Sequence, residues 1–384
     1  MIRAFPSLAG LAALAVALLA ADEATAARKS LPPAAEPSAR EAAEIDRTAR
    51  PRAAVLSSRP AVPDAAPTTR EAAPEAAAAM ATGTPAIRAG TIGTGVPSQE
   101  SFLPGFTPRS GGGTENYGRG NRDTIFQFTD AKVPADIVTA YPYRAAGYFS
   151  FKASDGNWYW CTASLIANSI LVTAGHCVHD GGNREKGWIR QGFFYPARSG
   201  DRRPYGRARV REVFTTDGWY AKGQLDRGTD VGLAVLDTRS GTGREIGRDT
   251  GTLAFCYRNC LSAFAFLSGL GYPKNYYGGR QMTVGHHLAA SDRRDFAFGS
   301  GMQGGSSGGP QVANLGSLAS DSGRAPERNV VFAVTSWGYT DRSLMIQGAS
   351  PLSGPDNGNG FRRMFNEACA AARRLHGRRS CEPL

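Results

Sequence analysis

Three short stretches of the sequence carry side chains that could act together in covalent catalysis. In LVTAGHC, His176 follows an apolar run; in TDVGLAVLD, Asp230 precedes another; and in GGSSGGP, Ser307 lies among glycines. A serine hydroxyl is a weak nucleophile at neutral pH and needs an adjacent base, and that base needs a carboxylate to fix its tautomer and stabilise its charged form. We therefore predict a base, an orienting acid and a nucleophile in the chain order His176, Asp230, Ser307, each at the end of a strand.

Other acids and histidines compete for these roles. Asp226 and Asp237 lie near Asp230, but Asp230 alone immediately precedes the apolar run. The HCVH stretch, residues 176–179, could be interpreted as zinc ligands. A zinc site, however, needs further ligands at suitable spacing, and the short loop between Cys161 and Cys177 favours a disulfide between these two cysteines. We therefore expect no metal and no cofactor.

A second pair of histidines, His286 and His287, could also bind zinc. Both fall in an expected strand, where successive side chains point to opposite faces. We therefore assign them a structural role, with one side chain facing inward and the other outward.

The segments that must position the three reactive residues have the pattern of a β protein. From residue 122 to Trp337, short apolar and β-branched runs alternate with clusters of Gly, Asn, Asp and Pro; the runs are GYFSF, SILVTA, DVGLAVL, MTVGHHLAA and VVFAVTSW. Many short strands with turn signals indicate an all-β barrel or sandwich and not a βαβ sheet.

The last part of the sequence predicts a helix. Its apolar residues follow the spacing of one helix face: Phe361, Met364, Phe365, Ala368, Ala372 and Leu375. We expect this helix to pack on the β body.

The first 121 residues are expected to lie outside the folded domain. Arg3 precedes an apolar run from Leu8 to Ala20, and a small-x-small motif ends at Ala26, so residues 1–26 read as a signal peptide. Residues 27–121 are rich in Ala, Pro and Arg and almost lack aromatics, which predicts a mostly disordered pro-segment or linker. The remaining residues, 122–384, form the predicted domain. Cleavage of a pro-segment is expected among the basic residues Arg109, Arg119 and Arg122.

Export makes the six cysteines candidates for disulfides. Six cysteines allow fifteen pairings, and short loops favour three of them: Cys161 with Cys177, Cys256 with Cys260, and Cys369 with Cys381. The last of these would fix the tail of the C-terminal helix. The formal net charge of +11 is scattered along the chain, so we expect solubility from it and no nucleic-acid partner.

The sequence resembles the trypsin-like (chymotrypsin-fold) serine proteases. The resemblance rests on CTASLIANSILVTAGHC, TDVGLAVL, GGSSGGP and VTSWG, and it covers the chain from about residue 122 onward. The stretches RDTIFQFTDAKVPADIVTAYPYRAAG and GLGYP are most similar to the secreted bacterial branch that includes the V8-like glutamyl endopeptidases. The resemblance implies an all-β fold of two six-stranded antiparallel Greek-key barrels with a C-terminal α-helix.

The resemblance also implies a role for each residue around the glycine turn. It makes Ser307 the nucleophile in place of Ser306, and it makes the N–H groups of Gly305 and Ser307 an oxyanion hole. Donors fixed in this way stabilise the negative oxygen of a tetrahedral intermediate. Where the digestive proteases have an acid that pairs with a new N-terminus, this chain has Ser306, so we expect a different mode of activation.

The primary pocket is also implied by the resemblance. Its base is expected at Gly301 and Met302, and its wall at Ser336, Trp337 and Gly338. Gly301 stands where trypsin has an aspartate, and Thr335 stands where glutamyl endopeptidases have a histidine. We therefore expect a pocket that is lined by uncharged side chains.

The sequence thus predicts a secreted, monomeric serine endopeptidase, made as a zymogen, that acts on proteins or peptides and has no membrane segment in its mature form. Two other functions remain open. A catalytically idle binding module would keep the fold, but the intact set of His176, Asp230 and Ser307 argues against it. A serine esterase would match GSSGG, although the alternating helices of an α/β sheet are missing from the pattern.

Overall fold

A computed structural model of the chain describes part of the sequence, namely residues 26–32, 37–52, 55–57, 86–91, 93, 128–225, 228–239, 241–260, 266–291, 296–316, 327–339, 345–354, 356 and 358–384. Apart from Ala26, the predicted signal peptide lies outside the described residues. So do the expected cleavage region around Arg109, Arg119 and Arg122, and Asp226, the rival of Asp230.

Six strands close into a first antiparallel barrel. They are β6 (Ala146–Lys152), β7 (Trp158–Ala167), β8 (Ile170–Thr173), β9 (Gln191–Pro196), β10 (Ala208–Thr215) and β11 (Gly232–Leu236). They pair in the order β6-β7-β8-β11-β10-β9, and β9 pairs with β6 to close the ring. Because β9 lies beside β6 and not beside β8, the connection is a Greek key. The runs GYFSF, SILVTA and DVGLAVL fall on β6, β8 and β11, where nearly every side chain is buried.

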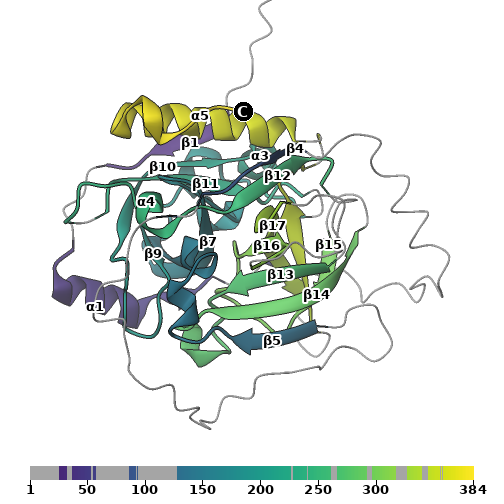
Figure 1. Ribbon diagram of the computed structural model, residues 1–384. Helices are drawn as coiled ribbons and strands as arrows, with labels where there is room; N and C mark the ends of the chain where they lie inside the picture. The colour runs from purple at the N-terminus through teal and green to yellow at the C-terminus, as the bar shows by residue number, and fades with distance from the viewer. Residues whose placement is uncertain are drawn as a thin grey trace, which may run out of the picture.

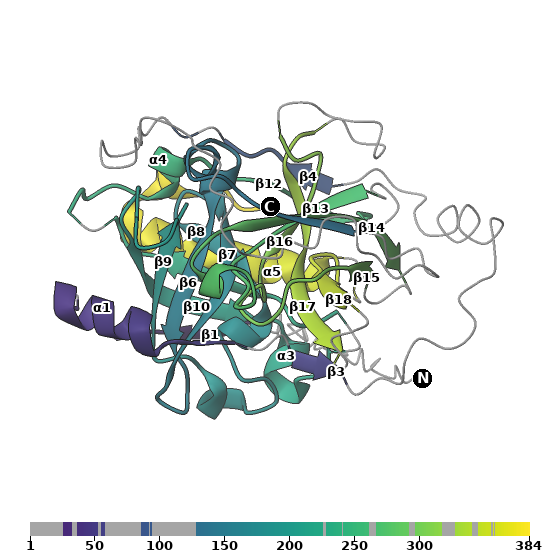
Figure 2. The same ribbon diagram turned by 90° about the horizontal axis from the view of Figure 1, so that it is seen from below.

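A second antiparallel barrel repeats this arrangement. Its strands are β13 (Phe266–Gly271), β14 (Thr283–Ser291), β15 (Phe296–Gly299), β16 (Pro310–Ala313), β17 (Val330–Tyr339) and β18 (Ile346–Pro351). The order is β13-β14-β15-β18-β17-β16, closed by the pairing of β16 with β13. The two barrels lie side by side (Figures 1 and 2). The prediction of two six-stranded Greek-key barrels is confirmed.

Two strands extend the second barrel. β5 (Phe128–Lys132) pairs with β14, and β12 (Ala254–Arg258), which follows the first barrel in the chain, pairs with β17. The short helices α3 (Asp217–Lys222) and α4 (Gly247–Thr250) lie in connections around the first barrel.

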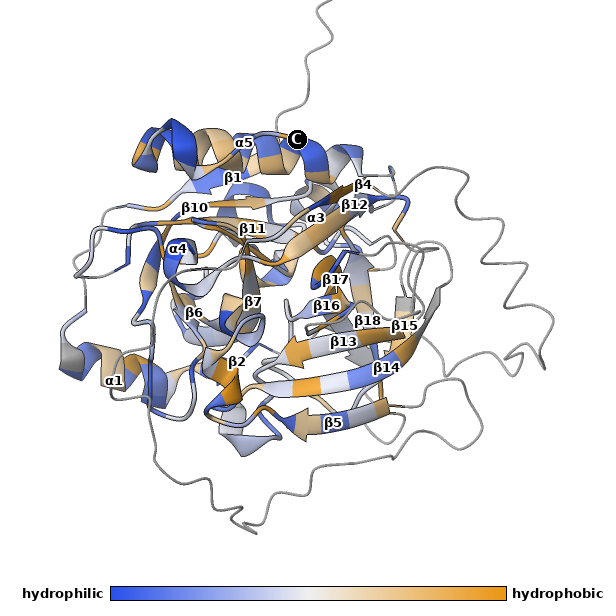
Figure 3. Ribbon diagram, in the orientation of Figure 1, coloured by the Kyte–Doolittle hydropathy of each residue, from blue (hydrophilic) through white to orange (hydrophobic). Residues whose placement is uncertain are grey.

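The predicted C-terminal helix is α5 (Asn359–His376), and it packs against the first barrel. Its apolar face shares one core with β6, β7 and β10. Figure 3 shows polar residues along the rest of its surface. The prediction of this face is wrong at its last member, because Leu375 is 37% exposed while the other five residues are buried. No helix in the described part of the chain is long and apolar enough to cross a membrane.

Parts of the N-terminal segment are ordered against the barrels. β1 (Ala27–Ser30) pairs with β10, α1 (Ala39–Thr48) begins with a Ser38–Glu41 capping box, and β2 (Arg50–Pro51) pairs with β7. β3 (Val55–Ser57) pairs with β17, and β4 (Ala86–Arg88) pairs with β12. This differs from the disorder expected of residues 27–121, because strand edges elsewhere in the fold supply backbone partners that local composition does not reveal. The proposed domain boundaries stay a prediction.

The cysteines pair as the short loops suggested. The structure contains Cys161–Cys177, Cys256–Cys260 and Cys369–Cys381 bridges. The first holds the end of β8 against β7, and the third fixes the chain after α5.

Candidate active site

His176 and Asp230 meet at one end of the first barrel. His176 lies in a short 3-10 turn (Gly175–Cys177) directly after β8, and Asp230 precedes β11, which pairs with β8. The His176 N–H donates to Asp230 Oδ1 at 2.7 Å, and His176 Nδ1 lies 2.8 Å from Oδ2. Both side chains are almost fully buried. The carboxylate thereby holds both the backbone and the ring of the histidine, which fixes Nδ1 as the protonated nitrogen and leaves Nε2 as the base.

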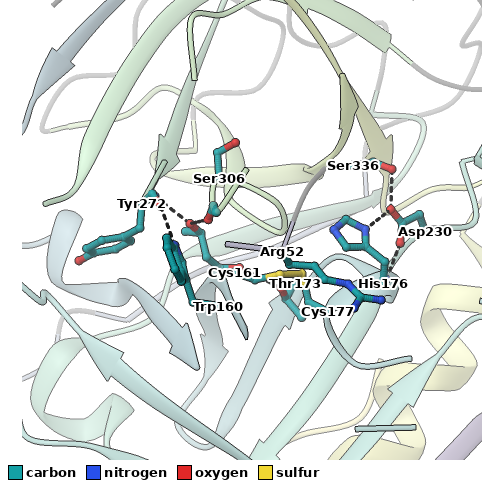
Figure 4. The surroundings of a disulfide bond; sticks show 12 residues. Arg52, Trp160, Cys161, Thr173, His176, Cys177, Asp230, Tyr272, Ser306 and Ser336 are labelled. Carbon is teal, nitrogen blue, oxygen red and sulfur yellow. Dashed lines mark hydrogen bonds and ion pairs between the residues drawn. A yellow bond between two sulfur atoms is a disulfide. The ribbon is translucent and has the colours of Figure 1, made fainter. Parts of the chain in front are cut away.

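A third group contacts the same carboxylate. The Ser336 hydroxyl, from β17 of the second barrel, donates to Asp230 Oδ2 at 2.6 Å. Figure 4 shows Ser336, Asp230 and His176 in one continuous chain of contacts. Sequence reasoning placed Ser336 only in the pocket wall, because nothing in VTSWG indicates that its hydroxyl reaches an acid from the other barrel.

Glycine is required beside this pair. A Cβ at Gly175 would lie 2.9 Å from Asp230 Oδ1 and 2.9 Å from Trp219 Cδ1. Both distances are shorter than ordinary carbon contacts, so a larger residue would displace the histidine loop from its acid.

Ser307 lies in a tight turn that precedes β16 of the second barrel. Its carbonyl accepts the Thr162 N–H of β7 at 2.8 Å, which anchors the turn to the first barrel. Gly308 follows with a φ of +76°, and a Cβ there would collide with Thr173 Oγ1 and the Thr162 carbonyl. The turn therefore requires glycine for both its conformation and its close approach to β7 and β8.

The two groups that would exchange a proton are buried without partners. Neither Ser307 Oγ nor His176 Nε2 has a hydrogen-bond partner among the described residues. A buried polar atom without a partner is costly. Other buried hydroxyls among the described residues, such as that of Ser350, also lack a partner, so what distinguishes this site is the carboxylate that fixes the His176 ring.

The hydroxyl of Ser306, the other serine of the turn, is hydrogen-bonded to other groups of the second barrel and its loops. Its hydroxyl donates to the Gln303 carbonyl at 2.8 Å and accepts from Gln347 Nε2 at 3.1 Å. Ser307 is therefore the serine of this turn whose hydroxyl has no hydrogen-bond partner among the described residues.

The backbone of the turn contains the two N–H groups predicted to form the oxyanion hole, those of Gly305 and Ser307. The Gly304 carbonyl accepts from the Lys274 N–H at 2.8 Å, and the Ser306 carbonyl accepts from the Gly309 N–H at 2.9 Å. In a trans peptide the N–H points away from the carbonyl of the same unit. The N–H groups of Gly305 and Ser307 therefore point away from these internal bonds, and the Gly305 N–H donates to the Arg52 carbonyl at 3.0 Å.

The predicted pocket residues lie in the second barrel and its loops. The Trp337 ring is buried over Gly348, where a Cβ would collide with it. Met302 is buried, and its sulfur would lie 3.0 Å from a Cβ at Gly271. Gly338 is buried in β17. The side chains of these residues are uncharged.

A buried acid next to Gly301 was missed by sequence reasoning. Asp130 of β5 is 1% exposed, and its Oδ2 accepts from the Gly301 N–H at 2.7 Å and from the Tyr276 hydroxyl at 3.2 Å. Burial raises the pKa of the Asp130 carboxyl to about 7, although both hydrogen bonds favour the ionised form. The pairing of β5 with β14 brings it there, and FQFTDAK carries no signal of such a contact.

The zinc alternatives do not fit the geometry. Among the described residues, Cys161, His176 and Cys177 come close enough together to suggest a metal site, but the two sulfurs form a disulfide. Both ring nitrogens of His179 are engaged, since Nδ1 accepts the Gly181 N–H at 3.0 Å and Nε2 lies 2.5 Å from the Arg184 carbonyl.

The histidine pair of β14 has the alternating orientation expected of a strand. His287 is buried and stacks on Phe298 with ring centres 4.2 Å apart, and burial lowers its pKa to about 3. His286 is half-buried and contacts Ser268 Oγ through Nδ1 at 2.8 Å.

Part of the chain that contains the His176–Asp230 contact matches a known protein family. Residues 137–251 match the family model described as Trypsin. The chain contains a trypsin-family domain. The matched range holds the whole first barrel with His176 and Asp230, whereas the Ser307 turn lies beyond it. The trypsin-family assignment therefore agrees with the two-barrel fold and with the contact between His176 and Asp230.

Two of the relatives that the chain resembles are bacterial proteins named as proteases. The chain is 26% identical over 195 residues to a glutamyl endopeptidase of Bacillus licheniformis, a match that covers 51% of this chain and 57% of that protein. It is 31% identical over 114 residues to a protein of Bacillus subtilis named an extracellular metalloprotease, covering 29% of this chain and 35% of that one. The chain thus spans between about a third and just over half of these relatives.

A solved structure of the protease Anisep from Arthrobacter nicotinovorans is also similar. It has 21% identity and a TM-score of 0.48, and the match covers 60% of this chain and 98% of that one.

Proposed function

We propose that the chain is a secreted serine endopeptidase that cleaves proteins or peptides through an acyl-enzyme intermediate. The observation that carries the proposal is the Asp230 carboxylate that fixes the His176 ring while His176 Nε2 stays buried without a hydrogen-bond partner among the described residues. Ser307 Oγ is likewise buried without a partner among these residues. The expected export signal in residues 1–26, the domain from residue 122 and the monomeric state belong to the same proposal.

The first half of the reaction forms the acyl-enzyme. Ser307 Oγ attacks the scissile carbonyl while His176 Nε2 takes its proton, and Asp230 stabilises the resulting imidazolium without taking the proton itself. The N–H groups of Gly305 and Ser307 bind the oxyanion, each contributing about 3 kcal/mol to the stability of the transition state. His176 then gives the proton to the leaving amine, and the C–N bond breaks.

Water completes the cycle. His176 Nε2 removes a proton from a water molecule, which attacks the acyl carbon, and the proton returns to Ser307 Oγ as the ester bond breaks. Gly301, Met302, Trp337 and Gly338 would surround the side chain on the acyl side of the scissile bond. Because their side chains are uncharged, we expect a preference for uncharged residues at that position.

The test uses the two neighbouring serines as a matched pair. Wild type, Ser307→Ala and Ser306→Ala are each incubated with a fluorophosphonate probe and with a mixed peptide library. We expect labelling and cleavage by wild type and by Ser306→Ala, and neither by Ser307→Ala. Cleaved bonds sequenced from the library give the preference of the pocket. If the folded wild type neither labels nor cleaves after residues preceding 122 are removed, the binding-module alternative replaces this proposal.

A further inference from the structure

The N-terminal segment is bound to the first barrel by more than backbone pairing. Asp46 of α1 contacts Arg198 Nη1 at 3.2 Å and also pairs with Arg203, and the Arg198 side chain is 1% exposed. Ile45 of α1 is buried beside the same barrel. A buried guanidinium needs a compensating charge. The helix therefore has a fixed position, and it holds the chain that follows it in place.

That chain leads directly to the proposed oxyanion hole. β2 pairs with β7 in parallel, and the Arg52 N–H donates to the Trp160 carbonyl at 2.9 Å. The Arg52 carbonyl then accepts the Gly305 N–H at 3.0 Å. One of the two donors proposed for the oxyanion is thus occupied by this chain's own carbonyl. Figure 4 shows Arg52 beside the Cys161–Cys177 disulfide, between His176 and Trp160.

The side chain of Arg52 is held away from the pocket. Its guanidinium pairs with Asp180 at 2.6 Å and lies over the Tyr159 ring, 5.1 Å from the centroid. Both partners belong to the first barrel, whereas the pocket residues Gly301 and Met302 belong to the second. A residue bound for cleavage would place its side chain in the pocket, so Arg52 is bound in a different way.

The chain after Arg52 occupies the pocket wall. β3 pairs in parallel with β17, with Val55 opposite Trp337 and Leu56 opposite Gly338. In the proposed reaction, the residues that lie along this wall precede the scissile carbonyl in the substrate. Here they follow the carbonyl that Gly305 binds, so the segment crosses the site in the opposite direction to a substrate.

We propose that residues 50–52 and 55–57 act as an intramolecular inhibitor of the active site, bound in the reverse direction and docked by α1. The inference rests on the proposed function. The segment occupies the Gly305 donor and the backbone edge of β17, so a peptide substrate cannot use either while it is bound. The reversed direction keeps the Arg52 carbonyl out of the orientation that a substrate carbonyl would need for attack by Ser307.

The first test measures how fast the full chain reacts with a fluorophosphonate probe. Arg52→Ala removes the ion pair to Asp180 and the contact with Tyr159, and we expect labelling about tenfold faster than wild type. The control is Arg47→Ala, which removes the same charge from an exposed arginine that pairs with Glu44 on its own helix. Equal rates for wild type and Arg52→Ala, or an equal gain from Arg47→Ala, would overturn the inhibitor.

A second pair of variants tests the docking helix. Asp46→Ala removes the partner of the buried Arg198 and should also accelerate labelling, while Glu44→Ala, which removes an exposed acid from the same helix, should not. Unchanged labelling in Asp46→Ala would contradict docking by α1. No labelling in any variant, including wild type, would overturn the proposed function itself and the inhibitor with it.

A synthetic peptide covers the case in which a variant fails to fold. A peptide of residues 37–57 added to the Arg52→Ala protein should slow labelling competitively and remain intact by mass spectrometry. The same peptide carrying Arg52→Ala should slow labelling to the same extent only at about a tenfold higher concentration. Cleavage after Arg52 would show that the segment binds as a substrate and would overturn the proposal.

Discussion

Ser336 donates its hydroxyl proton to the Oδ2 atom of Asp230 at 2.6 Å, and the two residues come from different barrels. The same oxygen contacts His176 Nδ1 at 2.8 Å. The relative position of the barrels is therefore coupled to the orientation of the proposed base.

Removing this hydroxyl should slow catalysis without weakening substrate binding. In Ser336→Ala, the Asp230 carboxylate loses one of three hydrogen bonds, so the histidine is held less firmly and kcat should fall about tenfold with KM little changed. Ser350→Ala is the matched control, because Ser350 is a buried serine of the same barrel whose hydroxyl has no partner among the described residues. Steady-state kinetics on a peptide substrate measure both. An unchanged kcat in Ser336→Ala would show that the backbone contact alone positions the histidine.

Asp130 should make stability fall as the pH rises. Burial raises the pKa of its carboxyl to about 7, whereas an aspartate in an unfolded chain titrates near 3.9. Between these values the folded protein binds a proton that the unfolded chain has released, so this contribution to stability is complete below pH 4 and is lost as the pH rises through 7. Asp130→Asn stays neutral throughout.

Denaturant unfolding of both proteins at pH 4.5, 6 and 8 measures this effect. The free energy of unfolding of wild type relative to Asp130→Asn should decline steadily across the series. A difference that is constant, or that grows in favour of wild type at high pH, would mean that Asp130 is ionised in the fold.

Gly308 should be irreplaceable for steric reasons beyond its backbone conformation. A Cβ there would collide with the Thr162 carbonyl and Thr173 Oγ1, so Gly308→Ala should lose at least about 3 kcal/mol of stability and all labelling of Ser307. Gly316→Ala separates the two causes, since Gly316 has a φ of +110° but no described atom within 4 Å of its Cβ position. It should cost about 1 to 2 kcal/mol and retain labelling. Thermal unfolding and probe labelling are measured for both variants. Equal losses of stability in Gly308→Ala and Gly316→Ala would show that the positive φ alone accounts for the effect.

Much of the fold followed from sequence because strand periodicity and turn residues are local signals. The runs that became β6, β8, β11, β14 and β17 were recognisable, and the short cysteine loops gave the three disulfides. His176, Asp230 and Ser307 were found from side-chain chemistry and resemblance. The structure brings His176 and Asp230 into contact. The roles of all three residues stay a prediction.

Contacts between segments that are distant in the chain could not be predicted from the sequence. Asp130 reaches Gly301 only because β5 pairs with β14, and Ser336 reaches Asp230 only because the barrels meet. The order of α1 depends on Arg198, which is 152 residues from Asp46. Composition within residues 27–121 carries no trace of that partner, so disorder was expected there.

The position of α5 bears on the sequence in which the barrels fold. Phe361 and Phe365 lie 5.6 Å and 5.2 Å from Phe255 between ring centres, and they share one core with Phe149, Leu165 and Val213 of the first barrel. A helix synthesised after the second barrel thus completes the interior of the first. We therefore expect the core of the first barrel to be completed only after both barrels and the helix have been synthesised, so that the two halves mature together.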